Sequence, residues 1–219
     1  MTLHATQPAA SIQRWAVLCA SIAGRDNTPL ARELFTRLER LYATPPRVYH
    51  TLDHAHDCIQ TFDRFAALAA DALLVEWALW LHDVVYVPGK ADNEADSAAV
   101  SSEFLAALGA PHNATIRADE LILATRHTGE PLSGDAALVA DVDMAILAAE
   151  PAVYARYAAG IRAEYAFAGE DQYRNGRAAF LRSLLARPVI YVTPDMRGVF
   201  EAPARDNVRR ELLRLGSSR

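Results

Sequence analysis

An apolar segment of helical length that ends in two ionisable residues constrains the fold most. Residues 71–83 carry apolar side chains around nearly the whole circumference of a helix, and they finish with Trp80-Leu81-His82-Asp83. A helix that is apolar all round lies in a protein core or a membrane, and no apolar run here reaches the roughly 18 residues that span a bilayer. We therefore expect a central buried helix. Because buried ionisable groups are costly unless they are paired or hold a metal, His82 and Asp83 need partners nearby.

The other segments repeat their apolar residues at the period of an α-helix. We expect helices at about 11–23, 28–42, 51–68, 93–109, 112–127, 135–149, 151–167, 171–186 and 204–215, in addition to 71–83. The β-branched run Val84-Val85-Tyr86-Val87 has no second such run to pair with, so we expect a loop there, and a short extended segment at 188–193. The prediction is an all-α chain, a single helical bundle of about nine or ten helices over residues 1–219, because no linker divides it.

Composition argues against several classes of protein. Hydrophobic residues make up 52% of the chain, which indicates a globular fold rather than disorder. Cys19 and Cys58 are too few for a disulfide framework or a zinc site built from cysteines. The net charge is −5 and the arginines are spread out, so we expect no nucleic-acid polymer as a partner.

Residues 1–10 do not resemble a secretory signal, and we expect a cytoplasmic protein without a membrane partner. An apolar helix face that is exposed would suit a homodimer. The alternative is that such a face packs into the core of the same chain.

Histidine and aspartate gather in three places along the chain. The segment Tyr49-His50-Thr51-Leu52-Asp53-His54 precedes the central helix, His82-Asp83 ends it, and Asp141-Val142-Asp143 follows later. His50 and His54 are four residues apart, so the early turn of a helix would present both on one face. His82 and Asp83 are adjacent, so they can bind one ion only from a helix end. Imidazole and carboxylate together suit a divalent cation, and Mn, Fe, Ni, Co, Zn and Mg stay open.

These blocks resemble the HD superfamily of metal-dependent phosphohydrolases. The resemblance covers Tyr49–His54, Trp80–Tyr86, Asn93–Ala98 and Asp141–Leu147, and it extends to Ile190–Thr193 and Ala204–Asn207, so that it spans about residues 47–210. It implies an HD-type helical domain in which the metal is bound by His54, His82, Asp83 and Asp143. Asp141 is then either a residue that supports a ligand or a charge on the helix surface.

The resemblance implies roles for further residues. Distantly related cyclic-nucleotide phosphodiesterases use a similar Tyr-His-x-x-x-His, in which the first histidine protonates the leaving oxygen. By that resemblance His50 is a candidate general acid, and its alternative role is to support the site through a hydrogen bond. Asp83 is expected to orient the attacking water as well as to bind the metal. Glu94 and His127 are candidates for a second metal site, and contact with phosphate is the alternative role for His127. An acid in a first helical turn, such as Glu94, is favourable by itself.

Two arginines are candidates to balance phosphate charge, Arg126 and Arg205, and Arg126 is otherwise a solvated surface residue. The remaining histidines are expected to take no part. His56 is expected to point away from the site, His112 to start a helix after Pro111, and His4 to lie in the N-terminal segment.

The function that the resemblance implies is hydrolysis of a phosphomonoester or phosphoanhydride, in a nucleotide or another small phosphorylated metabolite, by metal-activated water. Two alternatives are kept. One is an iron-dependent oxygenase. The diiron oxygenases of the superfamily carry two extra histidines between the His-Asp pair and the last aspartate. In this chain the same interval, between Asp83 and Asp143, holds His112 and His127. The other is a non-catalytic nucleotide-sensing domain with a structural metal.

Overall fold

The computed structural model describes residues 8–217, and this part of the chain contains α-helices and short 3-10 turns but no strand. The helices are α1 (Pro8–Ala23), α2 (Thr28–Tyr42), α3 (Leu52–Asp63), α4 (Ala72–Leu81), α5 (Asn93–Leu108), α6 (His112–Leu123), α7 (Gly134–Asp143), α8 (Pro151–Glu164), α9 (Glu170–Ala186) and α10 (Pro194–Ser217). The all-α prediction is confirmed. None of the described helices is long and apolar enough to cross a membrane. His4 lies outside the described residues.

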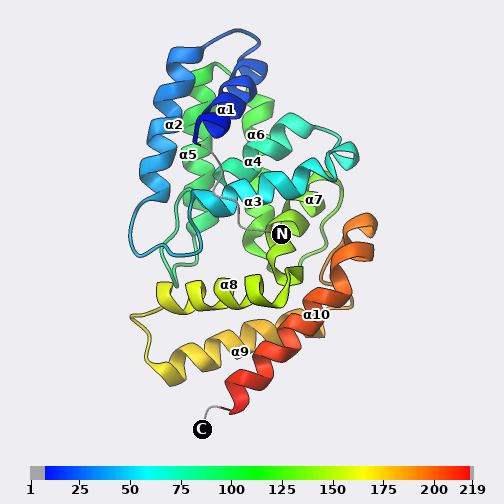
Figure 1. Cartoon of the computed structure of the whole chain (residues 1–219). Coiled ribbons are helices and arrows are strands. Elements are labelled where there is room, and N and C mark those ends of the chain that lie inside the picture. Colours follow the sequence, from blue (N-terminus) through cyan, green and yellow to red (C-terminus); the bar gives the residue numbers. More distant parts are fainter. Residues whose placement is uncertain (1–7, 218–219) are drawn as a thin grey trace.

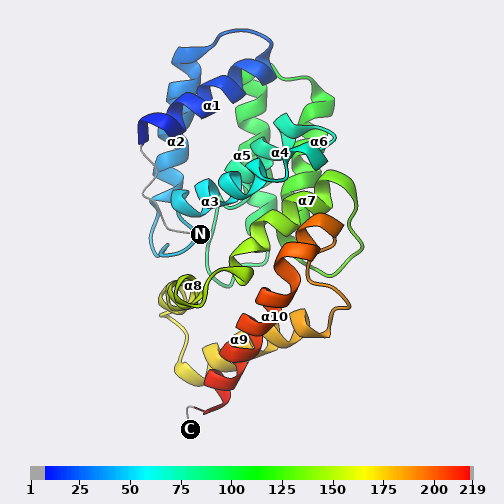
Figure 2. The ribbon, with the colours of Figure 1, turned by 45° about the vertical axis from the view of Figure 1, so that its right-hand side comes forward.

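Helices α1 to α7 gather at one end of the molecule, α8 and α9 lie at the other, and α10 runs from beside α7 to beside α9 (Figures 1 and 2). Helix α4 lies in the middle of the first group and contacts α1, α3, α5, α6 and α7. Its side chains Trp77, Leu79, Trp80 and Leu81 are fully buried, and Trp77 stacks on Trp15 of α1 with ring centroids 5.1 Å apart. The prediction of a central buried helix is therefore confirmed.

The start of α4 is fixed by two aspartates. Asp71 accepts a hydrogen bond from the Leu74 N–H, which is the usual form of an N-terminal cap. Buried Asp135 at the start of α7 accepts the N–H groups of Ala70 and Asp71 at 2.8 and 3.0 Å. These contacts satisfy backbone donors at the beginning of α4 that have no partner within the helix.

The last helix is longer than predicted. We expected it to begin at residue 204, but α10 begins at Pro194 and runs through Pro203. A proline inside a helix removes a backbone hydrogen bond and costs roughly 3 kcal/mol. A buried stripe at four-residue spacing continues across the proline, and this burial offsets that cost; its members are Met196, Phe200, Ala204 and Val208.

Four other predicted helices end earlier than expected, at Asp63, Leu123, Asp143 and Glu164. The first three are followed by 3-10 turns, at Ala66–Leu68, Ala124–Arg126 and Met144–Ala148.

Helix α10 packs against the 3-10 turn Met144–Ala148 that follows α7. Buried Asn207 donates from Nδ2 to the carbonyl oxygens of Leu147 and Ala149, both at 2.8 Å. The Tyr191 hydroxyl donates to the Met144 carbonyl oxygen at 2.9 Å. The turn after Asp143 is therefore held by side chains from the C-terminal part of the chain.

We predict that Asn207→Ala lowers the free energy of unfolding by about 1–3 kcal/mol, because it leaves two buried carbonyl groups without donors. The matched control is Asn175→Ala on α9, an exposed position where the expected change is within about 0.5 kcal/mol. Urea unfolding of the two variants measures the difference. Equal stability of the two variants would contradict this role for Asn207.

Candidate metal centre

Four residues that sequence analysis placed in one ligand set lie together. His54 comes from the first turn of α3, His82 and Asp83 directly follow α4, and Asp143 ends α7. The Nε2 atom of His54 lies 3.2 Å from His82 Nε2 and 3.1 Å from Asp143 Oδ1, and His82 Nε2 lies 3.4 Å from the same oxygen. Asp83 Oδ2 lies 3.2 Å from His82 Nε2 and 3.6 Å from His54 Nε2.

These spacings suit one cation. Donor atoms about 2.1 Å from a common ion lie roughly 3.0–3.4 Å from one another in octahedral or tetrahedral arrangements. The five donor separations above fall at or near that range. His82 also makes the second hydrogen bond that a metal-binding histidine requires, since its Nδ1 lies 3.0 Å from the Leu79 carbonyl oxygen. With Nδ1–H donating there, the Nε2 lone pair faces the cluster.

Cys58 places a buried thiol beside the cluster, a position that the sequence did not predict. Donor atoms of His54, Cys58, His82 and Asp143 all lie within 4.8 Å of one another, so this group can hold a metal ion. The four-residue spacing of His54 and Cys58 on α3 is a signal that could have indicated it. However, Cys58 Sγ is equidistant, at 3.8 Å, from both ring nitrogens of His54, so it lies beside the ring rather than along the Nε2 lone pair. Burial also raises the pKa of the thiol well above its ordinary value.

The charges of the cluster favour a cation. Burial would raise the pKa of Asp143, but hydrogen bonds from His127, His54 and His82 bring that pKa well below its ordinary value. Burial would lower the pKa of His82, but the Asp83 and Asp143 carboxylates raise it well above the ordinary histidine value. Two buried carboxylates therefore require positive charge beside them, from protons on the imidazoles or from a metal ion that displaces those protons.

His127 and Glu94, the candidates for a second metal, have other partners. His127 lies in a left-handed backbone conformation after the turn Ala124–Arg126, and its Nε2 lies 2.7 Å from Asp143 Oδ2. Asp143 thus has one oxygen toward His54 and the other toward His127. The nearest ionic partner of Glu94 is Arg126, at 4.0 Å, and burial raises the pKa of the Glu94 carboxyl group. A second metal between Glu94 and His127 stays a prediction.

His50 lies in the turn before α3, which begins at Leu52, and the expectation that a helix presents it with His54 is wrong. The two rings are nearly perpendicular, with centroids 5.9 Å apart. The His50 ring stacks on Tyr86 at 3.9 Å, and its Nδ1 lies 2.7 Å from Glu164 Oε2. Tertiary contacts, rather than helix geometry, therefore orient His50.

Glu164 at the end of α8 is the most important residue that sequence analysis missed. Its Oε1 accepts the backbone N–H groups of Val48, Tyr49 and His50 at 2.8, 2.7 and 2.9 Å, and its side chain is fully buried. Burial would raise the pKa of Glu164, but the hydrogen bonds from His50 and from the backbone lower it to about 2. No local sequence signal marks this residue, because its partners are more than a hundred positions away.

Arg47 joins the two loops that carry His50 and Asp83. Its guanidinium group donates to the carbonyl oxygens of His50, Asp83 and Val84 at 2.8, 2.7 and 2.8 Å. The planar guanidinium presents several N–H donors in a fixed arrangement, so it sets the separation of the two loops. Sequence analysis gave Arg47 no role.

The other sequence candidates serve the fold. Asp141 is buried and accepts the N–H groups of Val192 and Thr193 at 2.9 and 2.6 Å, so it is no helix-surface charge. Arg205 pairs with Glu201 and donates to carbonyl groups of residues 185, 187 and 188, which leaves it engaged away from any phosphate. His56 packs against Trp80 at 5.1 Å, and His112 begins α6 as expected.

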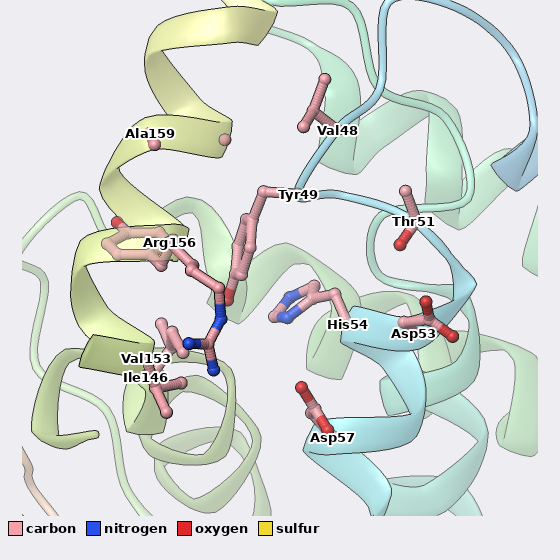
Figure 3. A pocket seen from close by; sticks show the side chains of 12 residues that line it. Val48, Tyr49, Thr51, Asp53, His54, Asp57, Ile146, Val153, Arg156 and Ala159 are labelled. Atoms are coloured by element: carbon pink, nitrogen blue, oxygen red, sulfur yellow. The ribbon is translucent and has the colours of Figure 1, made fainter. Parts of the chain in front are cut away.

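A cavity of about 430 Å³ reaches His54 between α3 and α8 (Figure 3). Arg156 extends into it from α8, facing Asp57 and His54 of α3. Helix α8 can come this close because residue 160 is glycine: a Cβ atom there would lie 3.1 Å from Tyr49 Cβ. The cluster is thus reached from a cavity whose walls come from both groups of helices.

Comparisons with protein-family models, curated proteins and solved structures found no match. The case for a metal centre therefore depends on the donor geometry and on the charge of the cluster. Membership in the HD superfamily stays a prediction that derives from the sequence blocks.

We predict that Asp83 is a ligand and that Cys58 is not. After chelation, the purified protein should bind one Mn²⁺ or Zn²⁺ per chain, and Asp83→Ala should weaken binding at least about tenfold, since removing even a partner of a ligand costs 10–100-fold. Cys58→Ser, a nearly isosteric change at the same cluster, should leave affinity unchanged. Isothermal titration calorimetry measures both. Loss of metal in Cys58→Ser with retention in Asp83→Ala would reverse the assignment.

We predict that Glu164→Gln lowers the free energy of unfolding at pH 7 by about 1–3 kcal/mol, because the buried carboxylate binds three backbone donors and His50. The pKa of Glu164 is about 2, below its ordinary value of 4.5, so its stabilisation is complete above pH 4.5 and is lost as the pH falls toward 2. The gap between wild type and variant should shrink over that range. Urea unfolding at several pH values tests this, with Glu39→Gln at an exposed position of α2 as the control. A gap that does not change with pH would contradict the prediction.

Proposed function

We propose that this protein is a metal-dependent phosphohydrolase of the HD type, acting on a nucleotide or another small phosphorylated metabolite. One observation carries the proposal: His50, fixed by Glu164, stands with its ring 5.9 Å from that of His54 in the His/Asp cluster. A proton donor beside a cation site is the arrangement that ester hydrolysis requires. The ordered sequence blocks that resemble the HD superfamily support the same reading.

Four residues would hold the cation, namely His54, His82, Asp83 and Asp143. A bound divalent cation supplies Lewis-acid polarisation of a phosphoryl oxygen and a lowered pKa for a water molecule at neutral pH. The mixed imidazole and carboxylate donors suit Mn, Fe, Ni, Co, Zn or Mg. Asp83 accepts a hydrogen bond from the attacking water and orients it toward phosphorus.

His50 acts as the general acid. Its Nδ1–H donates to Glu164, so the proton to be transferred is on Nε2. Water oxygen bonds to phosphorus, the bond between phosphorus and the leaving oxygen breaks, and the leaving oxygen takes the Nε2 proton. One proton of the water stays on the phosphate product, and the other is released to solvent, from which His50 regains its proton. Glu164 is a positioning residue, because it fixes the ring of His50 and touches no reacting atom.

Arg126 and Glu94 lie at the edge of this site. Arg126 is about one-third exposed and lies 4.0 Å from Glu94, a separation too long for a tight ion pair. Its guanidinium can therefore turn to a phosphate oxygen, which is a strong partner for arginine. Glu94 is available to a second cation together with His127.

The oxygenase alternative has less support. It calls for two further histidines at the cluster, and of the two in the relevant interval only His127 contacts it, since His112 begins α6. The alternative of a nucleotide-sensing domain predicts tight binding without turnover. Assays of turnover separate it from hydrolysis.

A screen of phosphate esters with Mn²⁺, Co²⁺, Ni²⁺ and Mg²⁺ tests the proposal by release of inorganic phosphate. We expect metal-dependent turnover that Asp83→Ala abolishes. His50→Ala should lower kcat about 100- to 10,000-fold while metal stoichiometry stays at the wild-type value. Glu164→Gln should lower kcat less, about tenfold, because the acid remains but loses its orientation.

The exposed variant Glu39→Gln serves as the control and should leave kcat unchanged. Turnover that survives both Asp83→Ala and His82→Ala would contradict the metal assignment. Tight nucleotide binding without phosphate release under every metal condition would favour the sensing alternative.

A further inference from the structure

A second cavity, of about 590 Å³, lies beside His50. It is formed by α8, the turn after it, residues 172–180 of α9 and Gly89. Figure 1 shows α8 and α9 below the α1–α7 group. His50 is the lining residue that comes from the candidate centre. The size is that of small-molecule pockets, which typically measure about 300–1,000 Å³.

Aromatic side chains dominate the walls of this cavity. They are Tyr157, Tyr165, Phe167, Tyr173 and Phe180. Phe167 is 68% exposed and stacks on Tyr165 with ring centroids 5.6 Å apart, and Phe180 is 38% exposed. Large aromatic rings left exposed around a cavity are suited to stacking with a flat ligand, because each gains contact area without a charged partner.

The charge within the cavity is already compensated. Arg177 pairs with buried Glu211 at 2.8 Å and donates to the Tyr157 hydroxyl at 3.2 Å, so its guanidinium is engaged. At the wall, the exposed amide of Gln172 offers a ligand both a donor and an acceptor. These walls suit an uncharged ring with a hydrogen-bonding edge. They do not suit a diphosphate leaving group, which would bring negative charge without a free cation.

We infer that this cavity binds an uncharged planar aromatic ring, that of the leaving group of the substrate. The inference rests on the proposed function, in which His50 protonates the leaving oxygen. A general acid must lie within hydrogen-bond reach of the oxygen that it protonates, so the group attached to that oxygen occupies the space beside His50. The substrate is therefore a phosphate monoester whose alcohol carries a planar ring, such as a nucleoside monophosphate, rather than a simple sugar phosphate.

The test uses one pair of substrates and one pair of variants, all with the full chain loaded with Mn²⁺. Adenosine 5′-monophosphate and ribose 5-phosphate have the same phosphate and sugar and differ in the ring. Gly176 on α9 lines the cavity and Gly198 on α10 does not, and a Cβ atom added at either position meets no atom within 4 Å. Gly176→Leu should fill the cavity, and Gly198→Leu adds the same side chain to a helix elsewhere.

We expect wild-type kcat/KM for adenosine 5′-monophosphate to exceed that for ribose 5-phosphate by at least about tenfold, the scale of one base stacked on aromatic rings. Gly176→Leu should remove this preference mainly through KM and leave ribose 5-phosphate turnover within about twofold, because it touches only the ring subsite. Gly198→Leu should match wild type. Equal kcat/KM for the two substrates, or a preference that Gly176→Leu leaves intact, would overturn the inference while the proposed hydrolysis stands.

A titration with adenosine, which has no phosphate, separates the two claims. If neither of these two esters releases phosphate, turnover gives no comparison between them, and the binding of adenosine then decides on the cavity. Binding that Gly176→Leu weakens, and Gly198→Leu does not, supports the ring site. Absence of adenosine binding, or binding that is equal in both variants, overturns it. Phe180→Ala provides a second variant, in which adenosine affinity should also fall.

Discussion

The candidate site depends on the pairing of two buried carboxylates, Asp83 and Asp143, with the imidazoles around them. A buried carboxylate without a partner costs several kcal/mol, so the helices that carry these residues must also deliver compensating groups to the same point. His54 and His82 do so from α3 and from the end of α4, and His127 contacts the second oxygen of Asp143. A cation at this point would satisfy both carboxylates at once.

Backbone groups at helix ends and in loops are bound by charged side chains, each of which binds two or three of them. Glu164, Asp141 and Asp135 each accept neighbouring N–H groups, and Arg47 donates to three carbonyl oxygens. Such contacts satisfy backbone groups that lie outside regular helices. Glu164 connects α8 to the loop that carries His50, and Asp141 connects α7 to the segment before α10, so these contacts join residues that lie far apart in sequence.

Periodicity and composition predicted the features that are local in the chain. The apolar circumference of residues 71–83 indicated the buried helix α4, and the adjacency of His82 and Asp83 required a position at a helix end, which both residues have. The contacts of Glu164 and Arg47 could not be predicted, because a charged residue in an ordinary setting carries no sign of its distant partner. The start of α10 was predicted at residue 204 rather than at Pro194, whereas the buried stripe on both sides of Pro203 continues the helix through the proline.

The most direct test of the central claim is a crystal structure with Mn²⁺, in which anomalous scattering locates the ion. We predict one strong anomalous peak bonded to His54 Nε2, His82 Nε2 and one oxygen each of Asp83 and Asp143, with the His50 ring still hydrogen-bonded to Glu164. A peak bonded to Cys58 Sγ in place of Asp83, or full Mn²⁺ saturation with no peak at this cluster, would contradict it.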